Sequence, residues 1–296
     1  MLGLCGLLAL AGCASGRARG TPSPTSPPQQ VARSEPTSTP SSLPQPTATP
    51  TVTPTPTPAG PLVALDPGHG GEDLGARHFN LEGNMDFHES TINLQIALRI
   101  GEKLKAKGYR VFYARDGNYY PNRSQQDMNG DGEFGPHDDL LYRVQLINQA
   151  GADLLLSLHE NAWEHRDESL VRATGGTTTY YCPDRPFGDQ SLRFATLVHE
   201  KVLAMLRAWG HEPTDRKVLI DHAPAVPGDP GGHFVILGPV DEVIKQASQM
   251  PGCLSEPLFI TCDAEAALMI RPDFQDTLAQ AYTDAIVAYF EEQPKE

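Results

Sequence analysis

The sequence predicts an α/β protein: a single domain with a mixed, mostly parallel sheet and helices on both faces, preceded by a disordered tether rich in Pro, Thr and Ser. Two observations predict this architecture. Strand-like and helix-like segments alternate along residues 61–296, as expected for strands joined by helical crossovers. That stretch of about 236 residues is also long enough to bury one sizeable core.

The expected strands are short runs rich in β-branched, aromatic and other apolar residues. They are Leu62–Leu65, Tyr109–Tyr113, Leu154–Leu158, Thr177–Tyr181, Phe234–Leu237 and Pro257–Thr261. The expected helices carry apolar residues every three or four positions. Their stripes are Ile92, Ile96, Ile100 and Leu104; Phe194, Val198, Val202 and Met205; and Phe274, Leu278, Ala281, Ala285 and Tyr289.

The N-terminal fifth of the chain has the composition of a leader and a tether. Residues 1–13 are apolar and end in Leu-Ala-Gly-Cys13, which resembles the lipidation signal of bacterial lipoproteins, although no Lys or Arg precedes the apolar run. A plain cleaved signal or a misassigned start codon is the alternative. Residues 14–60 cannot bury enough apolar surface to fold. The prediction is an envelope protein held on the outer side of the cytoplasmic membrane by lipid on Cys13, or else secreted.

Net charge and cysteine positions limit the expected partners and disulfides. The net charge of −14 and the lack of a basic run exclude nucleic acid as an expected partner. Three cysteines lie in the folded part, at positions 182, 253 and 262. If an extended strand joins the last two, their Cα atoms are about 30 Å apart. That distance excludes a disulfide between them. Cys182 either pairs with one of them or all three are buried thiols, and we favour thiols.

A histidine lies just beyond the end of each of two expected strands. His69 lies in the Gly-rich turn after the first strand, and His159 directly follows the third. Glu89 opens a helix one turn ahead of Ile92, on the face that packs inward, where a carboxylate needs a partner. Two imidazoles and one carboxylate suit Zn²⁺ with a fourth position open to water. The alternatives are ordinary hydrogen-bonded residues, or His88 in place of one ligand.

The order of these motifs resembles the zinc-dependent N-acetylmuramoyl-L-alanine amidases of the AmiC/CwlV type (amidase_3) over nearly all of residues 61–290. The resemblance implies that His69, Glu89 and His159 bind zinc and that peptidoglycan is the substrate. The matching segments are Asp66–Gly71, Glu89 with Asn93 and Leu94, Gly108–Val111, Arg115, Arg143, Asn148, Gly151–Asp153 and Ser157–Ala162.

The family also carries a catalytic glutamate after a Met-Pro pair and an apolar run. Here Glu256, which follows Met250 and Pro251, matches it, and the resemblance implies that it acts as the general base. The chain departs from the family pattern at Pro257 and at residues 260–262. Glu242 and Glu265 are therefore kept as alternatives.

Residues 118–140 form an insertion relative to the family. Part of it matches the ligand spacing of an EF-hand calcium loop, although its last acid is Asp instead of Glu and no clear helix precedes it. We expect either a structural Ca²⁺ site or a solvated turn. The candidate calcium ligands are Asp127, Asn129, Asp131, Glu133 and Asp138.

The resemblance implies hydrolysis of the amide between N-acetylmuramic acid and the L-alanine of the stem peptide. The alternatives are a zinc carboxypeptidase or endopeptidase acting on the stem, and a non-catalytic wall-binding module. Three further histidines, His165, His222 and His233, are on loops that we expect near the substrate groove. Residues 241–249 are also considered as a short inhibitory helix.

Overall fold

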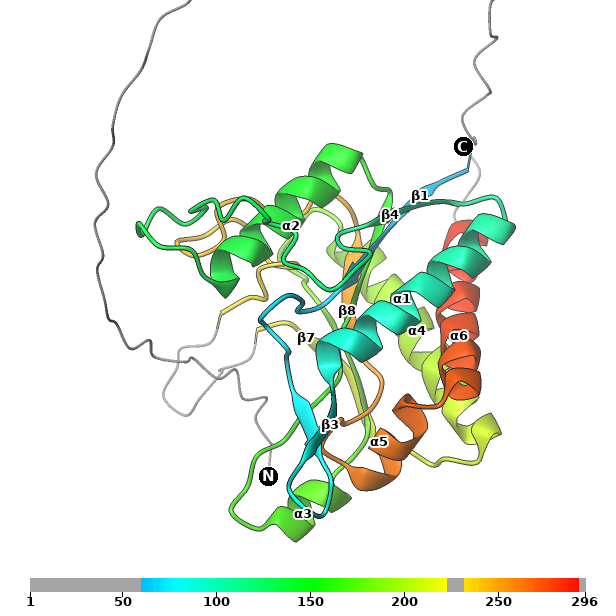
Figure 1. Ribbon diagram of the computed structural model, residues 1–296. Coiled ribbons are helices and arrows are strands. Elements are labelled where there is room, and N and C mark those ends of the chain that lie inside the picture. Colours follow the sequence, from blue (N-terminus) through cyan, green and yellow to red (C-terminus); the bar gives the residue numbers. More distant parts are fainter. Residues whose placement is uncertain (1–59, 223–231, 293–296) are drawn as a thin grey trace, which may run out of the picture. The chain divides into compact units, whose positions relative to one another are not determined.

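A computed structural model describes residues 60–222 and 232–292. A six-stranded sheet runs through the domain in the order β4-β1-β5-β8-β6-β7 (Figure 1). The first four strands in this order are parallel to one another, β6 is antiparallel to β8, and β7 is parallel to β6. The strands are β1 (Leu62–Pro67), β4 (Arg110–Tyr113), β5 (Leu154–Leu158), β6 (Thr177–Tyr181), β7 (Asp215–Ile220) and β8 (Gly252–Glu256). This is the mixed, mostly parallel sheet that the sequence predicts.

Helices cover both faces of the sheet (Figure 1). α1 (Glu89–Ala106), α4 (Gly188–Trp209) and α6 (Pro272–Glu291) pack on one face, and α2 (Pro136–Ala150) packs on the other. Side chains alternate along β1 as expected for a strand with two covered faces: Val63 and Leu65 join the first group of helices, while Ala64 packs with α2. The three helices that the apolar stripes predict are therefore confirmed.

Two predicted strands are wrong. Residues 234–237 form a turn in which the Leu237 N–H donates to the Phe234 carbonyl oxygen. Burial of Ile236 and Leu237 explains the apolar run, which does not distinguish a buried turn from a strand. The last strand runs over Gly252–Glu256 and not over residues 257–261. Pro257 ends it, because proline has no N–H for a neighbouring strand.

Several helices and strands were not predicted from the sequence. They are the edge strand β7, the small hairpin of β2 (Arg77–Phe79) and β3 (Met85–His88), helix α2, and the short helices α3 (Glu168–Ala173) and α5 (Asp263–Met269). Residues 241–249, all of them described, contain bends but no helix, so the hypothesis of a short inhibitory helix there is wrong.

Cys182, Cys253 and Cys262 are buried free thiols, as favoured from the sequence. Among residues 60–222 and 232–292, no helix is both long enough and apolar enough to span a membrane. The expected lipidation at Cys13 and the Pro/Thr/Ser tether fall outside the described residues.

Candidate metal centre

The parallel strands bring the candidate ligands to one edge of the sheet. β1 and β5 are neighbours, with Pro67 paired to Leu158, so the residues that follow them emerge side by side. His69 and His159 are those residues, and Glu89 is the first residue of α1. The carboxyl ends of parallel strands are the usual location of sites in α/β sheets.

The three side chains converge on one point. His69 Nε2 lies 3.1 Å from one oxygen of Glu89, and His159 Nδ1 lies 3.1 Å from the other. The two imidazole rings meet edge-on, 4.9 Å apart between centroids. One donor atom from each residue lies within 4.8 Å of the others. Two donors bound tetrahedrally to one zinc ion are about 3.4 Å apart, so the cluster fits the ion with small adjustments.

The charge balance of this cluster also fits a cation. Glu89 is 3% exposed. Burial disfavours its ionised form, but the charges and hydrogen bonds of His69 and His159 outweigh this and hold its pKa well below the usual range. Burial likewise disfavours protonated His69, yet Glu89 and Asp73 raise its pKa to about 10. Without a metal, the proton on His69 balances the charge of the carboxylate, and a dication would take over this role.

Two glycines make this convergence possible. A Cβ atom at Gly68 would lie 2.2 Å from the His159 ring, and one at Gly75 would lie 2.6 Å from a Glu89 oxygen. Gly75 also has a φ of +66°, a conformation that other residues adopt only with strain. Both positions therefore require glycine for the three ligands to approach one another.

A buried arginine holds the loop that carries His69. The guanidinium of Arg115 donates to the carbonyl oxygens of Pro67, Gly68 and Ser90. These bonds tie the end of β1 to the first turn of α1. Arg115 thus fixes His69 and Glu89 relative to each other, although it contacts neither side chain.

A second buried arginine, Arg143 on α2, supports the same loop from the other side. It donates to Asp66 at 2.8 Å, to Asp139 at 2.8 Å, and to the carbonyl oxygens of Pro67 and His69. Asp66 also accepts a hydrogen bond from the Ser157 hydroxyl. Burial opposes the charge on Asp66, but Arg143 outweighs it and holds its pKa below the usual value.

We expect Arg143→Met to lower the free energy of unfolding by about 3–5 kcal/mol, because it leaves the carboxylates of Asp66 and Asp139 buried without their cation. Denaturant unfolding followed by circular dichroism measures this. Lys103→Met is the matched control: it breaks the Lys103–Asp276 pair at the surface and should change stability by at most about 1 kcal/mol. Equal effects of the two substitutions would contradict the role assigned to Arg143.

Glu256 is the last residue of β8, beside the end of β5. The His159 N–H donates to the carbonyl oxygen of Ser255, which places Glu256 next to a candidate ligand along the sheet edge. The two alternatives are located differently. Glu265 accepts hydrogen bonds from the backbone N–H groups of Gly176 and Phe259, and Glu242 is exposed on the segment after the 234–237 turn.

Sequence reasoning missed two acidic residues at this edge. Asp73 lies 2.8 Å from Nδ1 of His69 and so orients that ring with Nε2 toward the cluster. The sequence offered one signal for Asp73: it lies four residues after His69, in the same Gly-rich turn. Glu160 is buried, and its pKa is raised well above the usual value by burial and by the charges of Glu89, Glu265 and Glu256. Nothing in the local pattern distinguished Glu160 from an exposed glutamate.

Within the 118–140 insertion, acidic side chains accept hydrogen bonds from backbone N–H groups of the same segment. Asp127 accepts hydrogen bonds from the N–H groups of Gly130 and Gly132, and Asp131 accepts one from Glu133. Asp138 accepts from Met128, Asn129 and Gly135, so it caps the start of α2. These bonds account for the acidic residues as turn-forming groups, and calcium binding by the loop stays a prediction.

The other histidines considered from the sequence are not among the three residues of the His69 cluster. His88 contacts the Ser90 hydroxyl and is not among the three converging ligands. His165 stacks on Trp163. His222 and His233 lie together beyond the end of β7, where His233 contacts Asp221.

The fold and the convergent His–Glu–His side chains define a class of protein: α/β proteins with a candidate mononuclear metal centre at the carboxyl edge of the sheet. The chain belongs to the Amidase_3 family, described as N-acetylmuramoyl-L-alanine amidase, whose profile matches residues 63–288. This confirms the resemblance seen in the sequence.

A curated relative agrees with the family, and two solved structures agree with the fold. The germination-specific N-acetylmuramoyl-L-alanine amidase of Bacillus subtilis (strain 168) is 28% identical over 238 residues, 79% of this chain and 81% of that protein. An N-acetylmuramoyl-L-alanine amidase from Clostridium difficile 630 superposes with a TM-score of 0.56 at 24% identity, covering 79% of this chain and 98% of that one. The catalytic domain of CwlV from Bacillus (Paenibacillus) polymyxa var. colistinus gives 0.54 at 24% identity, covering 78% and 98%. The two structures support the fold.

Proposed function

We propose that the chain hydrolyses the amide bond between the lactyl group of N-acetylmuramic acid and the L-alanine of the peptidoglycan stem peptide, with zinc held by His69, Glu89 and His159. The observation that carries the proposal is the convergence of these three side chains in a chain of the amidase family. Peptidoglycan is the partner, and the cell envelope is the place of action.

The donor set suits zinc, since two imidazoles and a carboxylate leave a fourth position free for water or substrate. Bound zinc would polarise the scissile carbonyl group and lower the pKa of water. The chain itself supplies the geometry. Asp73 orients His69, while Arg115 and Arg143 hold the backbone between Pro67 and His69 in place.

Glu256 is assigned the proton transfers. Its carboxylate takes a proton from the attacking water and returns it to the departing nitrogen of L-alanine, so that the C–N bond breaks and a lactyl carboxylate and a free amine form. Two facts support this role: its position at the end of β8 beside His159, and its match to the family's catalytic glutamate.

The test is digestion of intact peptidoglycan with the purified chain. We expect new amino termini of L-alanine without new reducing sugar ends, and loss of this activity on zinc chelation. New amino termini within the stem would reassign the chain to a zinc peptidase. Zinc binding without any cleavage would favour a wall-binding module.

The acidic loop of the insertion is proposed as a structural calcium site, supported by its EF-hand spacing. We expect calcium to raise the melting temperature of the wild type and not that of Asp127→Ala. The measurement is thermal unfolding with calcium or with a chelator selective for calcium. An equal response of the two proteins would leave the loop as a turn held by its own hydrogen bonds.

The leader is proposed to anchor the enzyme by lipid on Cys13, supported by the Leu-Ala-Gly-Cys sequence and the Pro/Thr/Ser stretch behind it. Expressed in a bacterium, the wild type should fractionate with membranes and incorporate labelled fatty acid. Cys13→Ala should do neither. Membrane association that survives this substitution would refute the lipid anchor.

A further inference from the structure

A second group of ligating side chains lies away from the His69 cluster. Cys182 follows β6, Asp221 follows β7, and His233 follows the undescribed residues 223–231. One donor atom of each lies within 4.8 Å of the others. We propose that Cys182, Asp221 and His233 bind a second zinc ion, distinct from the one assigned to the active site.

The register of the sheet separates the two sites. β6 is antiparallel to β8, with Thr178 paired to Glu256, so β6 starts at the edge where the active site lies and runs away from it. Cys182 is four residues further along, a separation of about 13 Å in an extended chain. The second cluster is therefore at the opposite edge of the sheet, and its ligands cannot serve the active site.

The distances within the cluster match those of a zinc site. Sγ of Cys182 lies 3.6 Å from Nδ1 of His233. A sulfur and a nitrogen bound tetrahedrally to one zinc ion are about 3.6 Å apart. Asp221 Oδ1 lies 2.9 Å from the same nitrogen, closer than the roughly 3.4 Å expected around zinc, so this pair must open slightly.

One buried oxygen of Asp221 has room for a ligand, judged from the part of the chain that the structure describes. Asp221 is fully buried, and its Oδ2 has no hydrogen-bond partner among the described residues. A buried carboxylate oxygen without a partner is costly, and a cation would supply that partner. Cys182 is fully buried as well.

Two side chains next to the cluster, Asp184 and His222, also suit a zinc site. Asp184 Oδ2 lies 3.6 Å from Nε2 of His233, on the side of the ring away from the cluster, where a metal-binding histidine commonly meets a carboxylate. The ring of His222 lies edge-on to that of His233, 5.1 Å between centroids, and brings a further nitrogen donor nearby. The His69 and His159 rings are arranged in a similar way.

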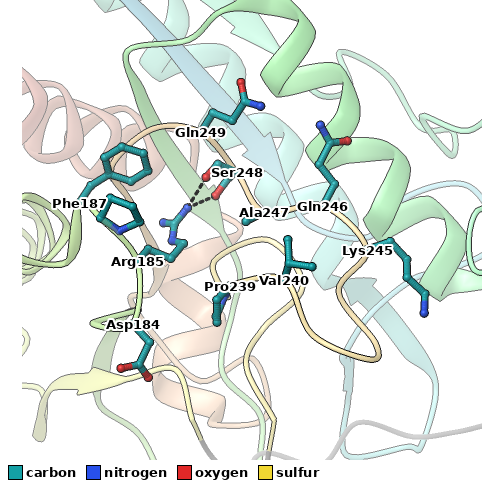
Figure 2. Close-up of a pocket in the computed structure, with 11 residues that line it drawn as sticks. Asp184, Arg185, Phe187, Pro239, Val240, Lys245, Gln246, Ala247, Ser248 and Gln249 are labelled. Carbon is teal, nitrogen blue, oxygen red and sulfur yellow. Dashed lines mark hydrogen bonds between the residues drawn. The ribbon is translucent and has the colours of Figure 1, made fainter.

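Asp184 and its neighbour Arg185 both line a pocket beside the cluster, and Arg185 does not compete for the contact between Asp184 and His233. Figure 2 shows Arg185 directed toward Ser248, to whose carbonyl oxygen it donates at 2.7 Å. Asp184 points away from that arginine in the same view. The Asp184 carboxylate therefore does not pair with the guanidinium of Arg185.

Burial excludes the other reading of these residues, a cysteine nucleophile with a His–Asp pair. Such a triad places the thiol and the carboxylate on different ring nitrogens, as Cys182 and Asp184 lie on Nδ1 and Nε2 of His233. The Cys182 thiol is fully buried, however, and is therefore closed to substrate. Thiolate, imidazole and carboxylate together favour zinc over magnesium or calcium, which prefer oxygen ligands alone.

The test is metal content of the full chain after chelation, reloading with zinc and desalting. We expect about two zinc ions per wild-type chain and about one for Cys182→Ser or Asp221→Asn. Asp184→Asn should keep both ions but weaken the second roughly 10–100-fold. Cys262→Ser, at another buried free cysteine, is the matched control and should keep two ions at wild-type affinity.

Cobalt(II) loading gives an independent, spectroscopic readout of the second site. A thiolate-to-cobalt charge-transfer band in the wild type, retained in His159→Ala, supports the proposal. A wild-type chain that binds one metal ion and shows no thiolate band overturns it. Amide hydrolysis measured on the same preparations separates this result from the proposed function, since a chain with two metal ions and no amidase activity would refute only the latter.

Discussion

His159→Ala is expected to lose one zinc ion per chain and to lower kcat/KM on peptidoglycan by at least about 1,000-fold. A bound zinc ion contributes several kcal/mol to stabilisation of the transition state, and about 1.4 kcal/mol corresponds to a factor of ten in rate. His159 and His69 contact opposite oxygens of Glu89, so removing one imidazole leaves a two-ligand site. Metal analysis and rate measurements on the same preparation test this.

His165→Ala is the matched control, because His165 is exposed and stacks on Trp163 away from the cluster. It should keep the wild-type zinc content and rate. Chelation of the wild type should reproduce the loss seen in His159→Ala, and added zinc should restore the wild type alone. A His159→Ala chain that cleaves peptidoglycan at the wild-type rate would refute the assigned zinc site.

Glu256→Gln is expected to lower kcat roughly 100- to 10,000-fold while the zinc content stays unchanged, because the amide has no basic site for the proton of water. The substitution keeps the size of the side chain, so the fold should persist. Steady-state rates, metal analysis and circular dichroism measure the three quantities separately.

Glu242→Gln is the control for this prediction, since Glu242 is the exposed alternative and should tolerate the change. If Glu242→Gln lowers kcat and Glu256→Gln does not, the base is misassigned. Equal small effects of both would mean that neither carboxylate carries the proton.

Strongly patterned segments could be predicted from the sequence. β1 and β5 are short apolar runs buried over their full lengths, and α1 carries its buried residues at helical spacing. His69 and His159 were predictable because each lies just beyond the end of such a strand. Parallel pairing of β1 and β5 then brings the two histidines together.

Elements that form through contacts with residues far away in the sequence could not be predicted. β7 lies at the edge of the sheet and none of its residues is buried, so it lacks an apolar pattern. α2 holds buried Asp139 and Arg143 on its inner face, and these polar residues break the apolar stripe that marks a helix. The group of Cys182, Asp221 and His233 spans more than fifty positions of sequence, and only the pairing of β6 with β7 assembles it.

The most direct test of the central claim is the fate of oxygen from isotopically labelled water during cleavage of a soluble muropeptide that carries an intact stem peptide. The account predicts one labelled oxygen in the lactyl carboxylate of N-acetylmuramic acid, read by mass spectrometry, and an unlabelled stem that begins with a free L-alanine amine. Label in a carboxylate of the stem peptide, with the lactyl amide intact, would contradict it.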